Sequence, residues 1–489
     1  MDILTRNVTN SKLLNLCFSN ITFCCCYGIF LFLYELKFMR EWIYQFHPIF
    51  LVWGSCIIVI NFLIKGQHKH FPHRFVFSLF CISAIITSIL TYESGIITNL
   101  KVLVLMIFPI LIIFPACWES RNKELACIKA MSGAAVVVFF ASLISIVMFL
   151  LRIRVIVTFF GIEELIGIQY YYPNDPTSAV ILYGIYQDTN HAAAYAIIMI
   201  IYSILLLDVC KKNIIKGKVI KHIGKSFAFS NIVVQCCYFP LANSRGGYLA
   251  LFITVIIGCA LYIFNVKKIT LNLFYKFMMF SLVAVVSLLI VYGGLVGLRS
   301  CLSSASYPIS NYFDIESNID QNEQQDSFSK NNSNFGAGRI LIWKDTWELC
   351  KEKPLFGTGP NYPYYCQKYN ISTTLLGMGK AVHNSYLELL LYYGFMGSIL
   401  LLLYWGLCIK DIVLWTIYHN QIKIKDLMMI LGVVFTLGIS FLLSCAFINV
   451  TAMYYTMILM LGCSFPNQEL YKFTTNNGII SIGRKNCEK

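Results

Sequence analysis

The residue types that could do chemistry in this chain fall in three short polar segments: Asn243–Gly247, Gly338–Trp343 and His383–Leu387. Their reactive members are Arg245, Arg339 and His383. A guanidinium binds phosphate oxygens in bidentate fashion. An imidazole titrates near neutral pH and can accept a proton from a hydroxyl. Two arginines and one histidine therefore favour a substrate with an anionic, lipid-linked phosphate and a reaction that uses a base.

Both arginine segments also admit a structural interpretation. Arg245 could be an anchor at a membrane edge, where an arginine must pair or reach water. Alternatively, Arg245 could bind a phosphate, and Gly246 could let the backbone approach that ligand. Arg339 begins a predicted helix, Arg339–Lys351, where a cation is unfavourable unless an external anion binds there with the free N–H groups. Trp343 could stack on a sugar or pack against the membrane surface.

The histidine segment lies directly before a helix signal. Ser385-x-x-Glu388 is a capping box, so His383 is either incidental to a helix start or a general base. Farther upstream, Asn190 and His191 precede an apolar run and are either a helix cap or part of a site.

Carboxylates and cysteines give little sign of a metal site. Asp175 and Asp188 are either solvated loop charges or site residues. No carboxylate or second histidine lies at ligand spacing from His383, and Asp-x-Asp and C-x-x-C pairs are missing. The sequence therefore predicts no metal and no cofactor. Three of the 19 cysteines fall in a long polar segment and could form one disulfide: Cys301, Cys350 and Cys366.

The elements that position these residues are predicted to be membrane helices. The 489 residues are 58% hydrophobic and only 13% charged, whereas soluble domains carry about 25% charged residues. Apolar runs of about 20 residues recur, which is typical of a polytopic helical membrane protein. The twelve runs are Leu13–Tyr34, Phe46–Ile64, Phe75–Thr91, Val102–Trp118, Met131–Leu151, Ala192–Asp208, Phe227–Leu241, Tyr248–Phe264, Phe277–Leu298, Tyr386–Leu407, Leu427–Phe447 and Val450–Phe465.

The basic residues predict the orientation of these runs. With a cytoplasmic N-terminus, the segments on the inner side carry twenty-four Lys and Arg, and the short outer segments carry six. Cytoplasmic loops are enriched in Lys and Arg, so both termini are predicted to be cytoplasmic and all three polar segments to lie outside. The net charge of +14 therefore reflects topology, and the sequence predicts no nucleic-acid partner.

Four regions follow from this topology. Residues 1–298 hold spans one to nine, 299–384 form an outer loop subdomain, 385–465 hold the last three spans, and 466–489 are a cytoplasmic tail. Within the subdomain, Asp314–Asn334 is rich in polar residues. Between the fifth and sixth spans, Val155–Ile168 is predicted to be an interfacial helix, followed by a loop at Tyr170–Pro176.

Together these residues resemble the O-antigen ligase / O-antigen polymerase family of bacterial envelope glycan enzymes. The resemblance spans about Tyr183 to Gly397 and rests on the order, spacing and shared outer location of the motifs. In two departures, Gln187–Asn190 replaces a more common Asn-Pro-Asn, and Asp314–Asn334 matches no family motif. The matching residues are Ser244-Arg245-Gly246-Gly247, Gly338-Arg339 with Trp343, Pro354, Gly357 and Gly359, His383-Asn384 with Tyr386-Leu387, and Gly394-Phe395-Met396-Gly397.

The resemblance implies an all-α, GT-C-like fold of about twelve transmembrane helices in the bacterial inner membrane, with a periplasmic active site. It implies a metal-independent glycosyltransferase that moves a glycan from undecaprenyl diphosphate to a hydroxyl of another glycan or of lipid A–core. Arg245 and Arg339 would bind the diphosphate and stabilise the leaving group, and His383 would deprotonate or orient the hydroxyl. The remaining substrate-binding residues are expected to be Asn190, Gly246, Asn384 and Trp343.

Two alternatives stay open. The residues do not distinguish a polymerase from a ligase, which differ mainly in acceptor. A multi-span transporter or flippase of lipid-linked glycans is the alternative from another class. Transporters tend to show internal repeats and charged residues in mid-membrane, whereas the polar groups of this chain gather in the predicted outer segments.

Overall fold

Every predicted apolar run contains a helix. The computed structural model describes residues 18–64, 66, 71–159, 162–170, 180–215, 217–265, 272–312, 337–373, 381–418, 423–445, 447 and 451–466. The helices of the twelve runs are α3 (Asn20–Tyr34), α5 (His47–Val59) with a π-helical turn η2 (Ile60–Ile64), α6 (Arg74–Leu90), α7 (Ile96–Trp118), α8 (Lys123–Leu150), α9 (Thr189–Lys211), α10 (Lys218–Ala242), α11 (Arg245–Asn265), α12 (Leu273–Tyr312), α16 (Ser385–Tyr418), α17 (Ile424–Ile439) and α18 (Ala452–Ser464). The prediction of a mostly helical, polytopic membrane protein is confirmed.

Short elements connect these helices. They are η1 (Lys37–Met39), α4 (Arg40–Tyr44), η4 (Tyr92–Ser94), β1 (Arg154–Phe159), β2 (Ile162–Tyr170), β3 (Val180–Gly184), α13 (Ala337–Glu352) and α14 (Tyr362–Lys368). Within the described residues, six helices are long and apolar enough to cross a membrane, or seven if the bent pair Lys37–Tyr44 and His47–Phe62 is one span. The number twelve and the GT-C-like arrangement stay predictions.

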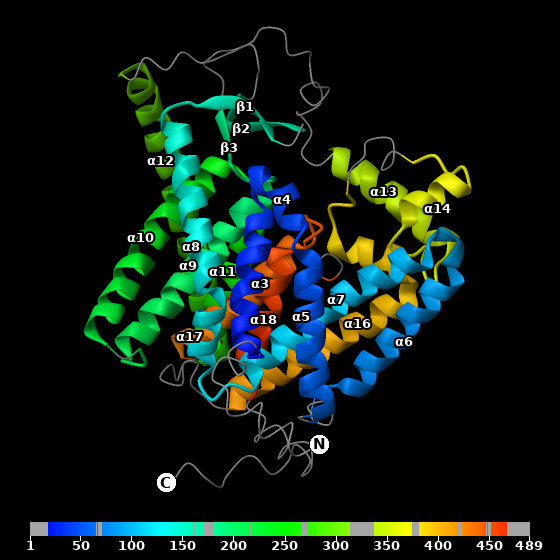
Figure 1. Cartoon of the computed structure of the whole chain (residues 1–489). Helices are drawn as coiled ribbons and strands as arrows, with labels where there is room; N and C mark the ends of the chain where they lie inside the picture. The colour runs from blue at the N-terminus through cyan, green and yellow to red at the C-terminus, as the bar shows by residue number, and fades with distance from the viewer. Residues whose placement is uncertain are drawn as a thin grey trace, which may run out of the picture.

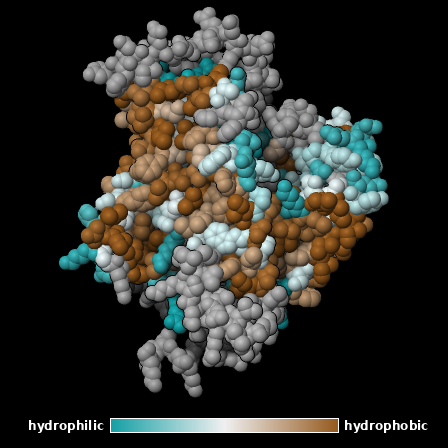
Figure 2. Space-filling model, viewed as in Figure 1, coloured by the Kyte–Doolittle hydropathy of each residue, from teal (hydrophilic) through white to brown (hydrophobic). Residues whose placement is uncertain are grey.

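The helices differ strongly in burial. Nearly every side chain of α18 is buried, and α9 begins with the buried alanines Ala192, Ala193 and Ala194. Small residues let neighbouring helices approach closely in a membrane protein. By contrast, only 6% of the apolar window of α12 is buried, so this helix lies at the edge of the bundle (Figure 1). Apolar side chains cover much of the bundle surface, whereas hydrophilic ones gather over α13 and α14 (Figure 2).

A small sheet corrects two predictions, the interfacial helix at Val155–Ile168 and the all-α fold. β1, β2 and β3 form an antiparallel sheet in that order, in which Ile156 pairs with Leu165. The run from Val155 to Thr158 is β-branched throughout, which favours strands over helices. Most of the predicted loop at Tyr170–Pro176 lies outside the described residues.

The long predicted outer segment, 299–384, begins inside a helix. α12 continues through Arg299 to Tyr312, and the bounds of the outer segment stay a prediction. α13 confirms the predicted helix. Its buried side chains are Ile342, Thr346, Leu349 and Cys350. Asp314–Asn334 lies outside the described residues. Cys301, Cys350 and Cys366 are free thiols, so the possible disulfide is not formed.

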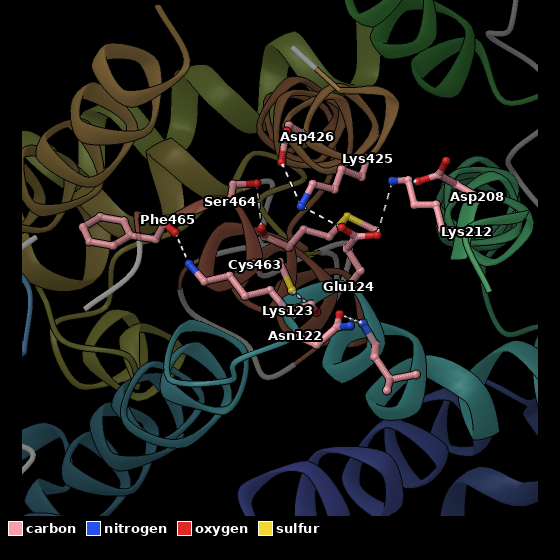
Figure 3. A network of polar contacts seen from close by, with 12 residues as sticks. Asn122, Lys123, Glu124, Asp208, Lys212, Lys425, Asp426, Cys463, Ser464 and Phe465 are labelled. Carbon is pink, nitrogen blue, oxygen red and sulfur yellow. Dashed lines mark hydrogen bonds and ion pairs between the residues drawn. The ribbon is translucent and has the colours of Figure 1, made fainter. Parts of the chain in front are cut away.

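The two ends of the bundle have different chemistry. The sheet, α13 and α14 lie toward one end (Figure 1), and an ionic cluster joins four elements at predicted inner helix ends (Figure 3). In that cluster Glu124 of α8 pairs with Lys425 of α17 at 2.6 Å and with Lys212 of α9 at 3.6 Å. Lys123 donates to the carbonyl of Phe465, directly after α18.

Candidate functional site

The candidate site is built on the head of α9, which is Asp188–His191. Asp188 is the N-cap, and its Oδ1 accepts from the backbone N–H of Asn190 at 2.6 Å and of His191 at 3.1 Å. Aspartate is among the preferred N-cap residues because its carboxylate satisfies free N–H groups at a helix start. The cap predicted at Asn190 and His191 therefore belongs to Asp188, two residues before Asn190.

A second helix start lies against this head. The hydroxyl of Ser244 donates to Oδ1 of Asn190 at 2.9 Å and accepts from the backbone N–H of Gly247 at 3.1 Å. Ser244 therefore caps α11 and ties it to α9. The next residue, Arg245, is exposed. The bond of Ser244 thus brings the segment of Arg245 next to Asn190, and the parts of both residues in a site stay predictions.

Gly246 has a packing contact in this structure. A Cβ added there would lie 3.3 Å from Cδ1 of Leu442 and 3.7 Å from Cδ1 of Ile439. The glycine therefore lets α11 approach the end of α17. Its predicted contact with substrate stays a prediction.

Arg339 lies in the first turn of α13. Its side chain is half-buried, and burial lowers the pKa of its guanidinium, while the nearby Asp188 carboxylate offsets part of that shift. Desolvation disfavours a charge, and an opposite charge restores it. Two residues 151 positions apart in the sequence therefore interact through their charges.

His383 is held just before α16 by its neighbours. Nε1 of Trp343 donates to the carbonyl of Val382 at 3.2 Å, which fixes the backbone directly before the histidine. His383 itself has a left-handed φ of 54°, which is uncommon outside glycine. Trp343 thus joins the helix of Arg339 to the segment of His383, and its predicted stacking on a sugar stays a prediction.

The cap of α16 differs from the predicted capping box. Oδ1 of Asn384 accepts from the backbone N–H of Tyr386 at 3.0 Å and of Leu387 at 3.1 Å, so Asn384 is the cap. Ser385 instead donates to the carbonyl of Leu443 at 2.8 Å and accepts from the N–H of Cys445 at 3.0 Å. The prediction was wrong because these long-range partners take the serine hydroxyl. Asn384 is buried, and its part in substrate binding stays a prediction.

The loop after α13 fixes the distance between Arg339 and His383. α16 breaks at Gly394, where φ is 61° and ψ is −169°. The broken turn leaves backbone groups that must be satisfied in an apolar surrounding. The loop supplies them: Thr358 and Gly359 donate to the carbonyls of Leu391 and Tyr392 at 2.8 and 3.1 Å. In return, Phe395 and Met396 donate to the carbonyls of Pro354 and Leu355 at 2.8 and 3.1 Å.

This backbone-to-backbone contact explains two of the motif glycines. A Cβ on Gly357 would lie 2.6 Å from backbone atoms of Gly394, Leu391 and Tyr392, and a Cβ on Gly394 would lie 2.4 Å from Leu355. Only a residue without a side chain fits at either position. The loop therefore packs backbone to backbone against the break in α16, and α13 leads directly into this loop.

Asp188 is the electrostatic centre of the site. Burial opposes its ionisation, but the charge on His191, the N–H donors of His191 and Asn190, and the charge on His383 together lower the pKa of its carboxyl. His191 also pairs with Glu35 at the end of α3, with Nδ1 3.6 Å from Oε2. Charges of His191 and His383 thus act on the Asp188 carboxylate, whose own charge acts on Arg339 of α13.

The arrangement can bind an anion between cations of separate elements. The first-turn N–H groups of α13 point toward the same end as Arg339, as a helix start that binds an anion requires. No group of three or more His, Cys, Asp or Glu side chains that could hold a metal occurs within the described ranges.

Two site residues carried little sequence signal. Asp188 was predicted only as either a loop charge or a site residue, although an aspartate just before an apolar run is an N-cap signal. Glu35 was missed, because nothing in the sequence around the end of α3 indicates a partner more than 150 residues away.

Comparison with known proteins agrees with the resemblance. A family described as O-antigen ligase matches residues 231–402. The match includes Arg245, Arg339 and His383 and excludes the head of α9. No curated protein matches the chain.

Proposed function

We propose that this chain transfers a glycan from undecaprenyl diphosphate to an acceptor hydroxyl at the periplasmic face of the bacterial inner membrane. The match of residues 231–402 to a family described as O-antigen ligase supports this proposal. The family match and the apolar helices support a membrane protein with a glycan-processing role of this type. The donor, the acceptor and the orientation belong to the proposal.

One observation carries the proposal. The charge of Asp188 acts on Arg339, and the charge of His383 acts on Asp188. On the same helix start, Asn190 accepts from Ser244, the residue before Arg245. A lipid-linked diphosphate needs cations at the membrane edge, and a hydroxyl acceptor needs a base close to the reacting carbon. The site supplies both from side chains of the chain.

In the proposed reaction, Arg339 and Arg245 bind the diphosphate oxygens of the donor. His383 accepts the proton of the acceptor hydroxyl as its oxygen bonds to the anomeric carbon. The bond between that carbon and the diphosphate oxygen breaks, and undecaprenyl diphosphate leaves with the bonding electrons. The arginines stabilise the negative charge that develops on this leaving group, without a metal ion.

The experiment is a gel of surface polysaccharide from cells that express variants. We expect His383→Ala and Arg339→Ala to abolish the polymer while the protein still inserts, because each removes a group that the transfer requires. His222→Ala and Lys344→Ala are the matched controls, since both residues are exposed and lie outside the site. Wild-type polymer in either site variant would contradict the assigned roles.

The same gel on a deletion strain distinguishes the two possible acceptors. Caps of a single repeat indicate a polymerase, which extends lipid-linked glycan. Bare core with accumulated lipid-linked polymer indicates a ligase.

A further inference from the structure

An arginine that the proposed transfer does not use is bonded to the turn that carries Arg245. Nη1 of Arg299, on α12, donates to Oδ1 of Asn243. Asn243 ends α10 in a left-handed conformation, with φ 50° and ψ 36°, and α11 begins two residues later at Arg245. The bond therefore places a second guanidinium at the short turn between α10 and α11.

The packing of α12 along α11 puts Arg299 at this turn. Nearer the other end of the two helices, Sγ of Cys259 lies 3.8 Å from Oγ of Ser287. Farther along, the ring of Tyr292 lies edge-on to that of Phe252, with centroids 6.3 Å apart. The helices thus run antiparallel, and two more turns of α12 lead from Tyr292 to Arg299 at the start of α11. The place of Arg299 is therefore fixed by the packing of two long helices.

The partner of Arg299 is neutral. Asn243 offers an amide oxygen, and within the described ranges no carboxylate pairs with Arg299. A guanidinium presents several N–H donors in a fixed fork, so one bond to an amide leaves the other donors for a ligand. An arginine at a membrane edge is costly unless it pairs or reaches water. An anion that reaches this turn would therefore meet a cation that is already oriented.

α12 also lies where a lipid-linked ligand would arrive. Only 6% of its apolar window is buried, against 28% for α11, and it lies at the edge of the bundle (Figure 1). A phosphate that is attached to a lipid chain approaches its site from the bilayer. Arg245 at the same turn is exposed. Two guanidiniums at one turn repel each other, and an anion bound between them would remove that repulsion.

We infer that Arg299 is a further phosphate-binding residue: it binds the diphosphate of the lipid-linked donor together with Arg245, and Asn243 holds its guanidinium in the binding orientation. This inference rests on the proposed function, which places a diphosphate at Arg245. Asn243 acts through Arg299 and is therefore a positioning residue.

The test measures binding of inorganic pyrophosphate to the full-length protein in lipid nanodiscs by isothermal titration calorimetry. We expect Arg299→Ala to bind about tenfold more weakly than wild type at low salt, because charge-assisted bonds to phosphate are lost. The loss should shrink as salt rises, because salt screens charge interactions. Arg299→Lys keeps the charge without the planar fork, so its affinity should fall by only about threefold.

Three further variants separate charge from position. Arg299→Gln removes the charge, but its amide can still donate to Asn243, so it should lose as much affinity as Arg299→Ala. Asn243→Gly removes the acceptor and keeps the left-handed turn, which glycine adopts readily, so binding should weaken by about threefold. Lys101→Gln, the matched control, removes an exposed positive charge near the start of α7 and should leave affinity unchanged.

The outcomes distinguish this inference from the proposed function. Wild-type affinity in Arg299→Ala and Arg299→Gln, with binding lost in Arg339→Ala, would overturn the role of Arg299 and leave the anion site in place. Weak binding by Arg299→Ala with wild-type affinity in Arg299→Gln would also overturn that role, since only the bond to Asn243 would matter. No binding by wild type would overturn Arg299 and the anion site together.

Discussion

Asp188, Asn190 and His191 lie within one turn of α9, and each contacts a different part of the protein. Asp188 accepts from the backbone N–H groups of Asn190 and His191, Asn190 accepts from Ser244, and His191 pairs with Glu35. Successive side chains of a helix point about 100° apart, so the side chains of one helix start can contact several neighbouring elements. The residues proposed to do chemistry thus depend on residues that only position them.

Ser244 allows this dependence to be measured. Ser244→Ala removes the cap of α11 and the bond to Asn190, and we expect a loss of about 1 to 2 kcal/mol in the free energy of unfolding. The melting midpoint of the detergent-solubilised protein should fall by a few degrees, and glycan transfer should weaken. Ser226→Ala, at an exposed position of α10, is the control. Equal midpoints for Ser244→Ala and wild type would contradict this role.

At the scale of elements, the broken helix α16 and the loop between α13 and α14 form one unit. Backbone N–H groups of the loop donate to the carbonyls that the break at Gly394 frees. In turn, backbone N–H groups of α16 donate to the carbonyls of Pro354 and Leu355. Trp343 adds a bond from α13 to Val382. α13 is therefore attached to the chain around α16 at two places, through Trp343 and through the loop that follows α13. These two attachments fix the separation of Arg339 from His383.

Gly394→Ala should break this unit. The backbone of Gly394, at φ 61° and ψ −169°, lies in a region that only glycine adopts readily, and a Cβ would meet Leu355 and Phe356 at 2.4 and 2.5 Å. We expect a destabilisation of about 3 kcal/mol or more, measured by thermal unfolding, together with loss of transfer.

Gly406→Ala on the same helix is the matched control. A Cβ there meets no atom within 4 Å, and alanine is the better helix former by about 1 kcal/mol. Its midpoint should equal or exceed that of wild type. Equal destabilisation by both changes would show that the break at Gly394 has no special role.

Local patterns predicted some elements well and others poorly. The helical spacing of Ile340, Trp343, Trp347 and Cys350 predicted α13 to within two residues at its start and one at its end, although Ile340 and Trp347 are exposed. β1 and β2 were missed because an apolar run beside membrane helices is ambiguous between helix and strand. The cap of α16 was assigned to Ser385 because its real partners, Leu443 and Cys445, lie nearly 60 residues away.

At the scale of the whole molecule, the site and the ionic cluster lie at opposite ends of the bundle (Figure 1). The polar segments with Arg245, Arg339 and His383 gather at the end of the sheet and α13. Glu124, Lys425 and Lys212 gather at the other (Figure 3). This separation agrees with the alternation of inner and outer segments that the Lys and Arg count predicts.

Reporter fusions test the predicted orientation. Alkaline phosphatase is active only outside the cytoplasm, so a fusion after Gly338 should be active and a fusion after Lys221 inactive. Measured enzyme activity in whole cells, corrected for fusion level, gives the answer. An inactive first fusion together with an active second one would reverse the orientation and place the site on the cytoplasmic side.

The sequence could name candidate site residues but not their surroundings. Arg339 and His383 were predicted from residue type and motif order, and their roles stay predictions. The electrostatic coupling of both to Asp188 could not be predicted, because they lie more than 150 residues away from it in the sequence. Glu35 shows the same limit, since only the packing of α3 beside α9 brings it to His191.

The most direct test of the central claim is transfer by the purified protein. Wild type, His383→Ala and Arg339→Ala are placed in lipid nanodiscs with a labelled glycan on undecaprenyl diphosphate, an acceptor glycan and a metal chelator, and the release of undecaprenyl diphosphate is followed. We predict transfer by wild type and a loss of about 100-fold or more in each variant. Transfer at the wild-type rate by either variant would contradict the account.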